Sequence, residues 1–415
     1  MGQAVFLDGR ADEVGRIQGE WQRAALCERV ERTLRRAHQL QNESVLRERA
    51  ERFASVLENA APHWIEEANG VANAAGIEPW QLLALNHLPP HFWGKDYVAP
   101  PLGGEILSED LVDIYEAQGV EPGMGGGDCT AFFALGDASI SGETLLHKNR
   151  DERDEVQSLY IKRIEGHFRF VGGGEIGNLG TAHAHSENFW AGANNTGSAV
   201  LPEEYVDCAL GDSHVLRLLC ERCASLDEIV PALEEWQSRG WVGGGGFEMG
   251  SIWILADAAR ALIIEATSKR LAHRRFDSQS GAMEVRTNHF LLPEMQEFCL
   301  APHPASVRRL TRAQELWQTQ SGIAGIAAAA ELGRDRDGAP QAICRNPSDH
   351  LGSVTVSTST ATVSSHDDRR CQTHFRNCHP AYVPAVILTP LDRVCDSDLL
   401  SGAHNQHWRN FRGGA

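Results

Sequence analysis

The residue of this chain best suited to covalent chemistry is Cys129, which follows a run of glycines in the stretch "MGGGDCTAFFALG". Three interpretations of its thiol are open. It can be a buried residue at the start of a strand, since free cysteine is among the most buried residue types. It can be a nucleophile served by a histidine and a carboxylate elsewhere in the chain. It can also become a chain terminus after cleavage, so that its own α-amine is the base.

The residues before Cys129 favour the third interpretation, because glycine adopts backbone conformations that other residues resist and self-cleavage needs such freedom. In this reaction the Cys129 thiol attacks the carbonyl carbon of Asp128, and the acyl group passes from nitrogen to sulfur. Water then hydrolyses the thioester and leaves a free amine on Cys129. A cut between Asp128 and Cys129 divides the chain into 1–128, a helical small chain, and 129–415, a strand-rich catalytic chain.

Further polar residues follow in three short stretches. "LLHKNRDE" contains Asn149, Arg150 and Asp151, "GANNTGSAV" contains Asn194, and "VRTNHF" contains Asn288. A carboxylate can position an amine or a thiol, and an amide NH2 can stabilise an oxyanion without titrating. Each residue also has a purely structural interpretation. Asn194 fits a turn, because asparagine tolerates positive φ, and Asp151 fits a surface salt bridge.

The elements that must position these residues change character at Cys129. Apolar residues recur at helical spacing through most of the first hundred residues, whereas residues 101–128 are acidic and glycine-rich and indicate a linker or exposed loop with one helix-like segment, "EDLVDIYEAQG". After Cys129, short strands alternate with helices. "CTAFFALG" and "SGETLLHKNRD" predict a hairpin, and Asp212 is the expected N-cap of a helix. This order predicts an α+β fold with packed sheets and outer helices.

Composition excludes several function classes. The chain has 415 residues, 38 basic and 56 acidic, with a formal net charge of −18, which argues against binding nucleic acid or an anionic membrane surface. The N-terminal stretch "MGQAVFLDGRADEVGR" lacks the apolar core of a secretion signal, and no stretch reaches the apolar length that spans a bilayer. The ten cysteines show no tight framework of spacings and are expected to be reduced thiols. These features predict a cytoplasmic protein.

Two other groups of residues have the side chains of metal ligands. Cys220 and Cys223 form a Cys-x-x-Cys pair, but a structural zinc site needs two more ligands at sensible spacing. His183 and His185 in "TAHAH" could form a metal pair on one face of a strand, and a zinc-dependent hydrolase is therefore an alternative. The two cysteines fit a structural role better, and the two histidines fit a polar wall of the substrate cleft or the surface. Neither a metal nor another cofactor is therefore expected.

Several of these stretches, taken in order, resemble the acyl-coenzyme A:isopenicillin-N acyltransferase family, autoproteolytic members of the Ntn-hydrolase superfamily. The resemblance rests on "IEEANGVANAAGIEPWQLLALN", "DCTAFFALG", "LLHKNRDE", "GANNTGSAV", "WILADAARALIIEAT" and "VRTNHF", and it extends roughly from Ala50 to Pro384. The Gly-x-Asn-x-x-Gly stretch is also shared with the more distant choloylglycine hydrolases. The resemblance implies a four-layer αββα sandwich preceded by a mainly helical segment.

The resemblance also implies roles for individual residues. Cys129 is the nucleophile and its freed α-amine the general base, while Asp151 positions the amine or the thiol. Asn194 and Asn288 form the oxyanion hole or hold the amine. Where a glycine is expected before the nucleophile, this chain has Asp128. The weaker candidates are Thr130, Asn149 and Arg150, and Arg369 and Arg370 do not align convincingly with the late arginine that such proteins carry.

The expected function is cleavage of a linear amide C–N bond through an acyl-cysteine intermediate, with a small amide, an N-acyl amino acid, a peptide-like conjugate or an acyl-CoA as the acyl donor. Hydrolysis is the preferred outcome because water is always available. One alternative is acyl-CoA-dependent N-acyl transfer, and another is a non-catalytic, uncut binding protein on the same fold. The two self-cleaved chains are expected to stay associated, with homo-oligomer formation left open.

Overall fold

The structure is a computed structural model of the whole chain. It describes residues 5–89, 92, 129–139, 142, 144–152, 157–244, 248–319, 325–339, 341–345, 354–363, 371–376 and 385–388. Asp128, Arg369, Arg370, the segment 101–128 with its expected helix, and part of the late strand "YVPAVILTP" lie outside these residues. No helix within the described ranges has the length and apolar character needed to cross a membrane.

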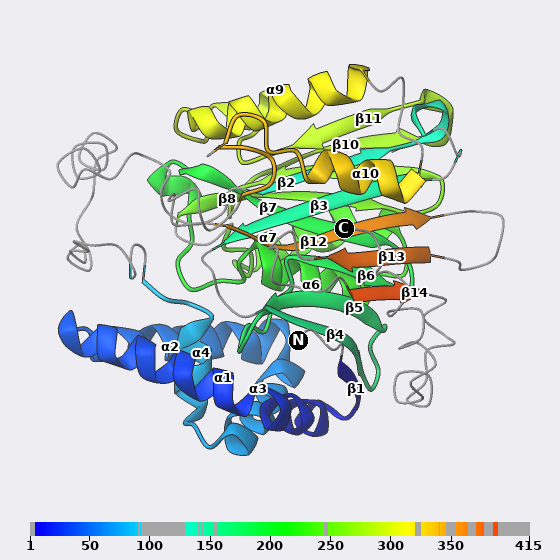
Figure 1. The fold of residues 1–415 in the computed structure, drawn as a ribbon. Helices are drawn as coiled ribbons and strands as arrows, with labels where there is room; N and C mark the ends of the chain where they lie inside the picture. Colours follow the sequence, from blue (N-terminus) through cyan, green and yellow to red (C-terminus); the bar gives the residue numbers. More distant parts are fainter. Residues whose placement is uncertain are drawn as a thin grey trace.

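The N-terminal segment is mainly helical, as the spacing of its apolar residues predicts. It forms α1 (Ala11–Gln39), α2 (Glu43–Ala60), α3 (Pro62–Ala75) and α4 (Pro79–Leu85) (Figure 1). Proline at the start of α3 and α4 suits a first helical turn, which has no partner for that N–H. Gly76 ends α3 with φ of 79°, the left-handed conformation that glycine adopts most readily. A short strand that the sequence did not predict, β1 (Val5–Gly9), comes before α1.

The remaining strands form two sheets. The first contains, in spatial order, β1, β4 (Gln157–Ile164), β5 (Phe170–Glu175), β6 (His183–Ser186), β7 (Trp190–Ala199), β8 (Met249–Ala256), β9 (Arg260–Ala266) and β10 (Leu271–Asp277). The second contains β11 (Met283–Arg286), β2 (Thr130–Ala134), β3 (Thr144–Glu152), β12 (Val354–Val363), β13 (Cys371–Arg376) and β14 (Ala385–Leu388).

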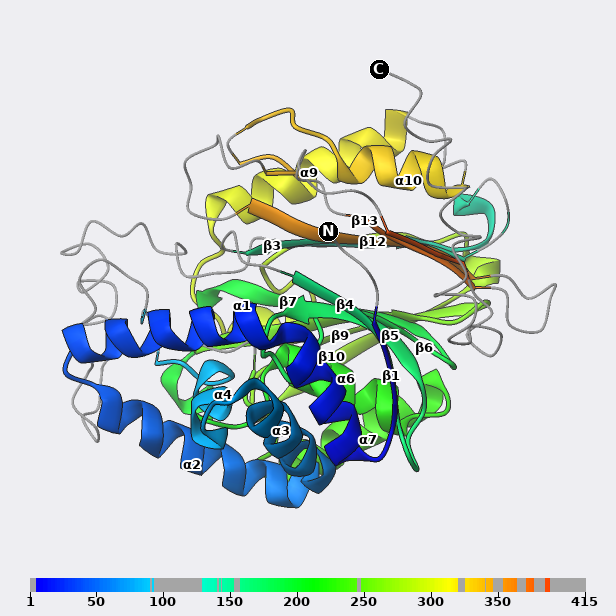
Figure 2. The same ribbon diagram turned by 60° about the horizontal axis from the view of Figure 1, so that its bottom comes forward.

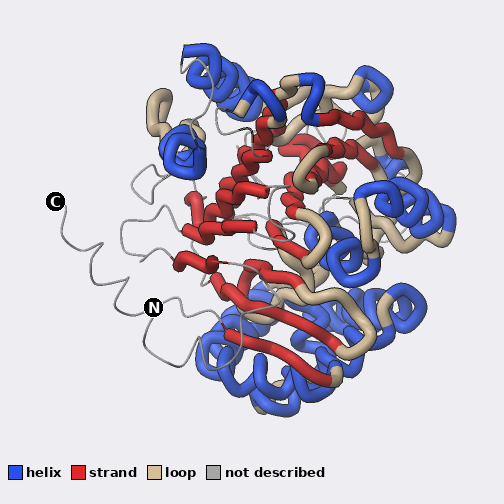
Figure 3. Tube along the Cα trace, turned by 90° about the vertical axis from the view of Figure 1, so that its right-hand side faces the viewer, coloured by secondary structure: helices blue, strands red, loops and turns tan. Residues whose placement is uncertain are grey.

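The two sheets pack face to face between layers of helices (Figures 2 and 3). Helices α6 (Asp212–Arg222) and α7 (Leu226–Ser238), with α1–α4, cover the eight-stranded sheet, and α9 (Pro304–Thr319) and α10 (Gly325–Gly333) cover the six-stranded one. A short helix, α8 (Pro293–Gln296), lies between β11 and α9 in the chain. Alternating residues of β2 pack inward against Trp190 of β7 and outward against α9 and α10. The αββα order of layers confirms the expected fold class.

Two local expectations are corrected. The "GANNTG" stretch is not a turn, because Asn194 and Asn195 lie within the continuous strand β7, paired with Ile252 and Ser251 of β8. Residues 212–238 form two helices, because the chain is extended at Cys223 between α6 and α7. Gly211, not Asp212, is the N-cap residue of α6.

The N-terminal segment joins the rest of the molecule at the edge of the eight-stranded sheet. β1 pairs with β4 in parallel, with Val5 opposite Tyr160 and Gly9 opposite Ile164. The sheet is therefore built from strands on both sides of Cys129 in the sequence. The parts of the chain before and after Cys129 can separate only if this ladder is broken.

Helices α1 and α3 approach closely where glycines face the partner backbone. A Cβ atom added to Gly19 would lie 2.4 Å from the Val71 carbonyl oxygen, and one added to Gly70 would lie 2.3 Å from the Asp12 carbonyl oxygen. Real Cβ atoms do not come so close to backbone. These glycines therefore set the separation of the two helices.

We expect Gly19→Ala to destabilise the protein, although alanine is the better helix former. The gain from helix propensity is about 0.5–1 kcal/mol, whereas overpacking costs about 1–3 kcal/mol and here acts against backbone that cannot rotate away. Urea unfolding should show a lower midpoint for Gly19→Ala and little change for the control Glu28→Ala on the exposed side of α1. An unchanged or raised midpoint for Gly19→Ala would contradict this packing.

Candidate active site

Cys129 lies immediately before β2 and is buried, with 6% of its surface exposed. Ala131 and Phe133 of β2 pack in the core between the two sheets, and alternation along the strand directs Cys129 to the same side. Its carbonyl oxygen accepts a hydrogen bond of 2.6 Å from Nη1 of Arg309. The cysteine is therefore held at the beginning of a central strand, with its side chain toward the opposite sheet.

Lys148 of β3 is the charged group beside the thiol. Its side chain is fully buried, and its ammonium group interacts electrostatically with Cys129. Burial lowers the pKa of Lys148, while Cys129 and Asp151 oppose this shift by favouring the ammonium form. The Lys148 Nζ also donates a hydrogen bond of 2.5 Å to Oδ1 of Asn194 on the other sheet. Lys148 thus bridges the two sheets at the nucleophile.

Asn194 has all its polar atoms in use in this structure. Its Oδ1 accepts from Lys148, and its Nδ2 donates to the carbonyl oxygens of Arg286 and Thr287 at 3.1 and 3.0 Å. The amide therefore connects three strands or strand ends: β3, β7 and the end of β11. It can position Lys148, but its NH2 group is directed at backbone and not at the thiol.

Asn288 is joined to the nucleophile through Arg309 of α9. The fully buried Arg309 guanidinium donates to Thr130 Oγ1 at 3.0 Å and to Asn288 Oδ1 at 2.9 Å, besides the Cys129 carbonyl. The Asn288 Nδ2 donates to the carbonyl oxygen of Asn195 at 2.8 Å. One arginine therefore ties the cysteine, the threonine after it and the predicted asparagine into a single cluster.

The other predicted residues of β3 divide between its two faces. Asn149 lies on the α10 side, where its Nδ2 donates to the carbonyl oxygen of Gly333 at 2.6 Å. Asp151 is on the same side by alternation and accepts a hydrogen bond of 2.5 Å from Thr355 of β12. Arg150 lies on the thiol side and forms an ion pair of 2.6 Å with Glu175 of β5.

The structure therefore brings Cys129, Thr130, Asn194 and Asn288 together and places Asn149 and Asp151 behind the strand. Asp151 still acts on the site electrostatically, because its charge favours the ammonium form of Lys148. His183, one of the two candidate metal ligands, is buried near Lys148, and this burial and the nearby cation lower its pKa. The one convergent group of metal-ligating side chains within the described residues includes neither His183 nor His185.

Lys148 and Arg309 were not predicted from the sequence. Lys148 stands inside the quoted stretch "LLHKNRDE", where its burial cannot be read from a strand that is apolar at one end and polar at the other. Arg309 had a detectable signal, because Ser306, Arg309 and Ala313 form the buried stripe of α9 at helical spacing. An arginine within such a stripe needs buried partners, and this one finds them at Cys129.

This arrangement of cations can stabilise negative charge on sulfur or on an oxyanion near it. We therefore expect Lys148→Met to slow alkylation of Cys129 by iodoacetamide, because a cation beside a thiol favours attack by its sulfur. Peptide mass mapping distinguishes Cys129 from the other thiols. The exposed Lys269→Met is the matched control. Equal alkylation rates in all three proteins would show that Lys148 does not act on the thiol.

Asp212, the first residue of α6, provides a pH test of the same region. Burial raises its pKa to about 6, although the Ser213 N–H, Arg150 and Lys148 favour its charged form. The folded protein then binds more protons than the unfolded chain between the usual Asp pKa and about 6. Its contribution to stability is thus present at low pH and lost as the pH rises through about 6.

Asp212→Asn should remove this penalty and keep the hydrogen bond from Ser213. We expect the variant to be more stable than the unsubstituted protein by about 1–3 kcal/mol at pH 7.5, with a smaller difference at pH 4.5. Urea unfolding at both pH values measures it. Asp227→Asn, at an exposed carboxylate paired with Arg260 and Arg275, should show no such gain. A stability gain of Asp212→Asn that is larger at pH 4.5 than at pH 7.5 would contradict the raised pKa of Asp212.

Comparison with known proteins supports the fold and the resemblance of the later motifs. The family model described as Acyl-coenzyme A:6-aminopenicillanic acid acyl-transferase matches residues 195–378. No curated protein matches the chain. The matched segment contains Asn288 and Arg309, whereas Cys129 and Lys148 precede it. The chain is thus similar to the acyl-coenzyme A:6-aminopenicillanic acid acyl-transferase family over residues 195–378, which confirms the resemblance predicted from its sequence motifs.

Proposed function

We propose that this protein is an autoproteolytically activated, N-terminal-cysteine amide hydrolase or acyltransferase that works through an acyl-cysteine intermediate. The observation that carries the proposal is the position of Cys129. It begins a central strand of an αββα sandwich, with its thiol against a buried ammonium group and its carbonyl held by a buried guanidinium. A nucleophile at the start of a strand can carry its own base if the chain is cut before it.

In the proposed activation, the Cys129 sulfur bonds to the carbonyl carbon of Asp128 and the peptide C–N bond breaks, giving a thioester and a free amine. Water then cleaves the thioester, and residue 128 leaves as a carboxylate. Arg309 supports this step by holding the Cys129 carbonyl and Thr130, so that the atoms after the scissile bond stay fixed.

In the proposed catalytic cycle, the new α-amine of Cys129 takes the thiol proton as the sulfur attacks the acyl carbon of the substrate. The same proton passes to the leaving amine when the C–N bond breaks. Lys148 stabilises negative charge on the sulfur, and Asn194 positions Lys148. Asn288, held by Arg309, is the candidate for holding the α-amine or donating to the oxyanion, which requires its amide to exchange its present partners. Asp151, behind β3, supports the site by favouring the ammonium form of Lys148.

The acyl acceptor separates two versions of this function. Hydrolysis uses water and needs no further site. The description of the matching family favours a second candidate, in which an acyl-CoA thioester acylates Cys129 and an amine then takes the acyl group. Both versions use a small-molecule acyl donor and the same intermediate.

The two proposed chains have many contacts that can keep them associated after a cut. In a buried cluster, Glu67 of α3 forms ion pairs with Lys162 of β4 and Arg217 of α6. The Arg49 guanidinium of α2 also pairs with Asp207 at 2.6 Å. Together with the β1–β4 ladder, these contacts support a small chain that stays bound.

The direct experiment compares intact masses and activities of the purified protein and Cys129→Ala. We expect the unsubstituted protein to yield fragments 1–128 and 129–415, and Cys129→Ala to remain one uncut, inactive chain. Amide and acyl-CoA donors are screened with product identification by mass. Cys299→Ala is the control and should cut itself and turn over normally, because its thiol donates to the carbonyl oxygen of Ser198 and belongs to none of the contacts of the site.

An uncut chain that retains activity, with Cys129→Ala changing nothing, would contradict the proposal. A protein that is neither cut nor active would favour the non-catalytic alternative. Asp128→Gly then tests whether the acidic side chain before the nucleophile is what prevents the cut.

A further inference from the structure

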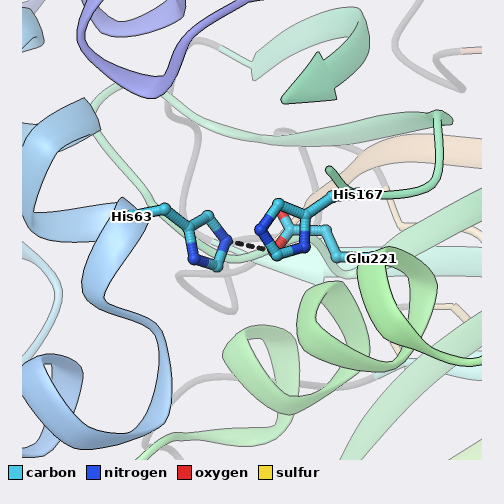
Figure 4. Close-up of side chains that lie close together, drawn as sticks. All are labelled: His63, His167 and Glu221. Carbon is cyan, nitrogen blue, oxygen red and sulfur yellow. Dashed lines mark hydrogen bonds and ion pairs between the residues drawn. The ribbon is translucent and has the colours of Figure 1, made fainter. Parts of the chain in front are cut away.

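Three side chains with metal-ligating atoms converge outside the cluster around Cys129. His63 is the second residue of α3, His167 follows β4 in the turn to β5, and Glu221 lies near the end of α6. One ligand atom from each lies within 4.8 Å of the others. Figure 4 shows the three side chains approaching from separate elements, with the hydrogen bond between His63 and Glu221 drawn as a dashed line.

The spacing is close to what a tetrahedral metal centre needs. Zinc bonds of about 2.0–2.1 Å place two ligand atoms roughly 3.3 Å apart. The His63 Nε2 and the Glu221 Oε2 are 2.9 Å apart, so a small opening admits a metal ion in place of the proton that they share. The His63 and His167 rings are stacked, with centroids 4.0 Å apart. The His167 ring must therefore rotate to aim its nitrogen at the same point, which its partly exposed position in a turn permits.

The carboxylate is already oriented by partners outside this group. Its Oε2 accepts from Trp64 Nε1 at 2.9 Å, and its Oε1 accepts from Arg217 Nε at 2.7 Å. The Glu221 side chain is only 1% exposed, so these bonds fix its direction. Hydrogen bonds to a ligating carboxylate are the usual outer support of a protein metal site.

Solvent has access to the group from one side. His167 and Glu221 line a hollow of about 790 Å³, together with Arg163, Phe168, Arg222 and neighbouring residues. A hydrated ion can enter by this route and keep a water molecule as its fourth ligand. Two imidazole nitrogens, one carboxylate oxygen and a water form a ligand set that suits zinc and similar divalent transition metals.

We propose that His63, His167 and Glu221 bind a divalent transition-metal ion of the zinc class. The ion links α3 to α6 and to the β4–β5 turn. Because His63 precedes Cys129 and the other two ligands follow it, the metal joins the parts of the chain that cleavage separates. Metal binding itself is independent of the proposed function, and only this stapling of two chains depends on it.

Zinc titration of the full, chelator-treated protein tests the site, with bound metal measured after equilibrium dialysis. We expect one zinc ion per chain that is lost in His167→Gln, with affinity reduced at least tenfold. His273→Gln, at an exposed histidine of β10, is the matched control and should bind as the unsubstituted protein does. Zinc should also raise the thermal unfolding midpoint of the unsubstituted protein and of the control, but not of His167→Gln.

Equal zinc binding by His167→Gln and the unsubstituted protein would overturn the proposal, because the metal would then be held elsewhere, for example by thiols. Absence of binding at micromolar zinc would also overturn it. His63→Gln gives a second reading if His167→Gln folds poorly, as judged by circular dichroism. Cys129→Ala should bind zinc normally, so failure of the metal site and failure of self-cleavage can be distinguished.

Discussion

The hydrogen bond from the Lys148 ammonium to Asn194 is the interaction on which the candidate site depends. A buried charge is costly unless it is paired and hydrogen-bonded, so the position of Lys148 constrains every group near it. Asn194 must sit in a strand of the opposite sheet, and its own amide must find acceptors at the end of β11. The thiol of Cys129 is a further partner of the same ammonium. The same contacts of Lys148 therefore hold the two sheets together and position the nucleophile.

A second buried cation completes the cluster from outside the sheets. Arg309 of α9 contacts the chain at the start of β2 and holds the backbone of Cys129 and the side chain of Asn288. Buried charges are also paired at the N-terminal helices, where Glu67 of α3 forms ion pairs with Lys162 and Arg217. In both places opposite or polar partners come from segments distant in sequence. These buried groups fix how the layers fit together, and apolar packing alone would leave that arrangement less specific.

The sequence was sufficient for features that depend on local periodicity. Helical spacing predicted α1–α4, and the hairpin of β2 and β3 followed from a short apolar run, a turn and a second run. Motif order predicted the sandwich. Local patterns failed where a tertiary partner decides the outcome. The stretch around Asn194 has the composition of a turn, yet its backbone is extended because it pairs with β8. The residues of β1 carry no strand signal of their own, and they become a strand because they pair with β4 at the edge of the sheet.

The site itself was predicted in part for the same reason. Cys129, Asn194 and Asn288 belong to recognisable short stretches, and the structure gathers them. Lys148 carries no local mark of its role, because a lysine in a strand is usually solvated. The helical spacing of Arg309 with Ser306 and Ala313 indicates one face of α9 but does not identify the partners of the arginine. Asp151 was predicted beside the thiol, and its place behind β3 follows from the two-residue repeat of a strand. Its influence therefore passes through Lys148.

The most direct measurement of the central claim is the mass of the acyl-enzyme. The protein is mixed briefly with an amide or acyl-CoA donor that it turns over, quenched in acid, and digested for tandem mass spectrometry. The account predicts that the acyl group is attached to Cys129 and that this residue begins its peptide with a free α-amine. An acyl group on another residue, or turnover with Cys129 still joined to Asp128, would contradict it.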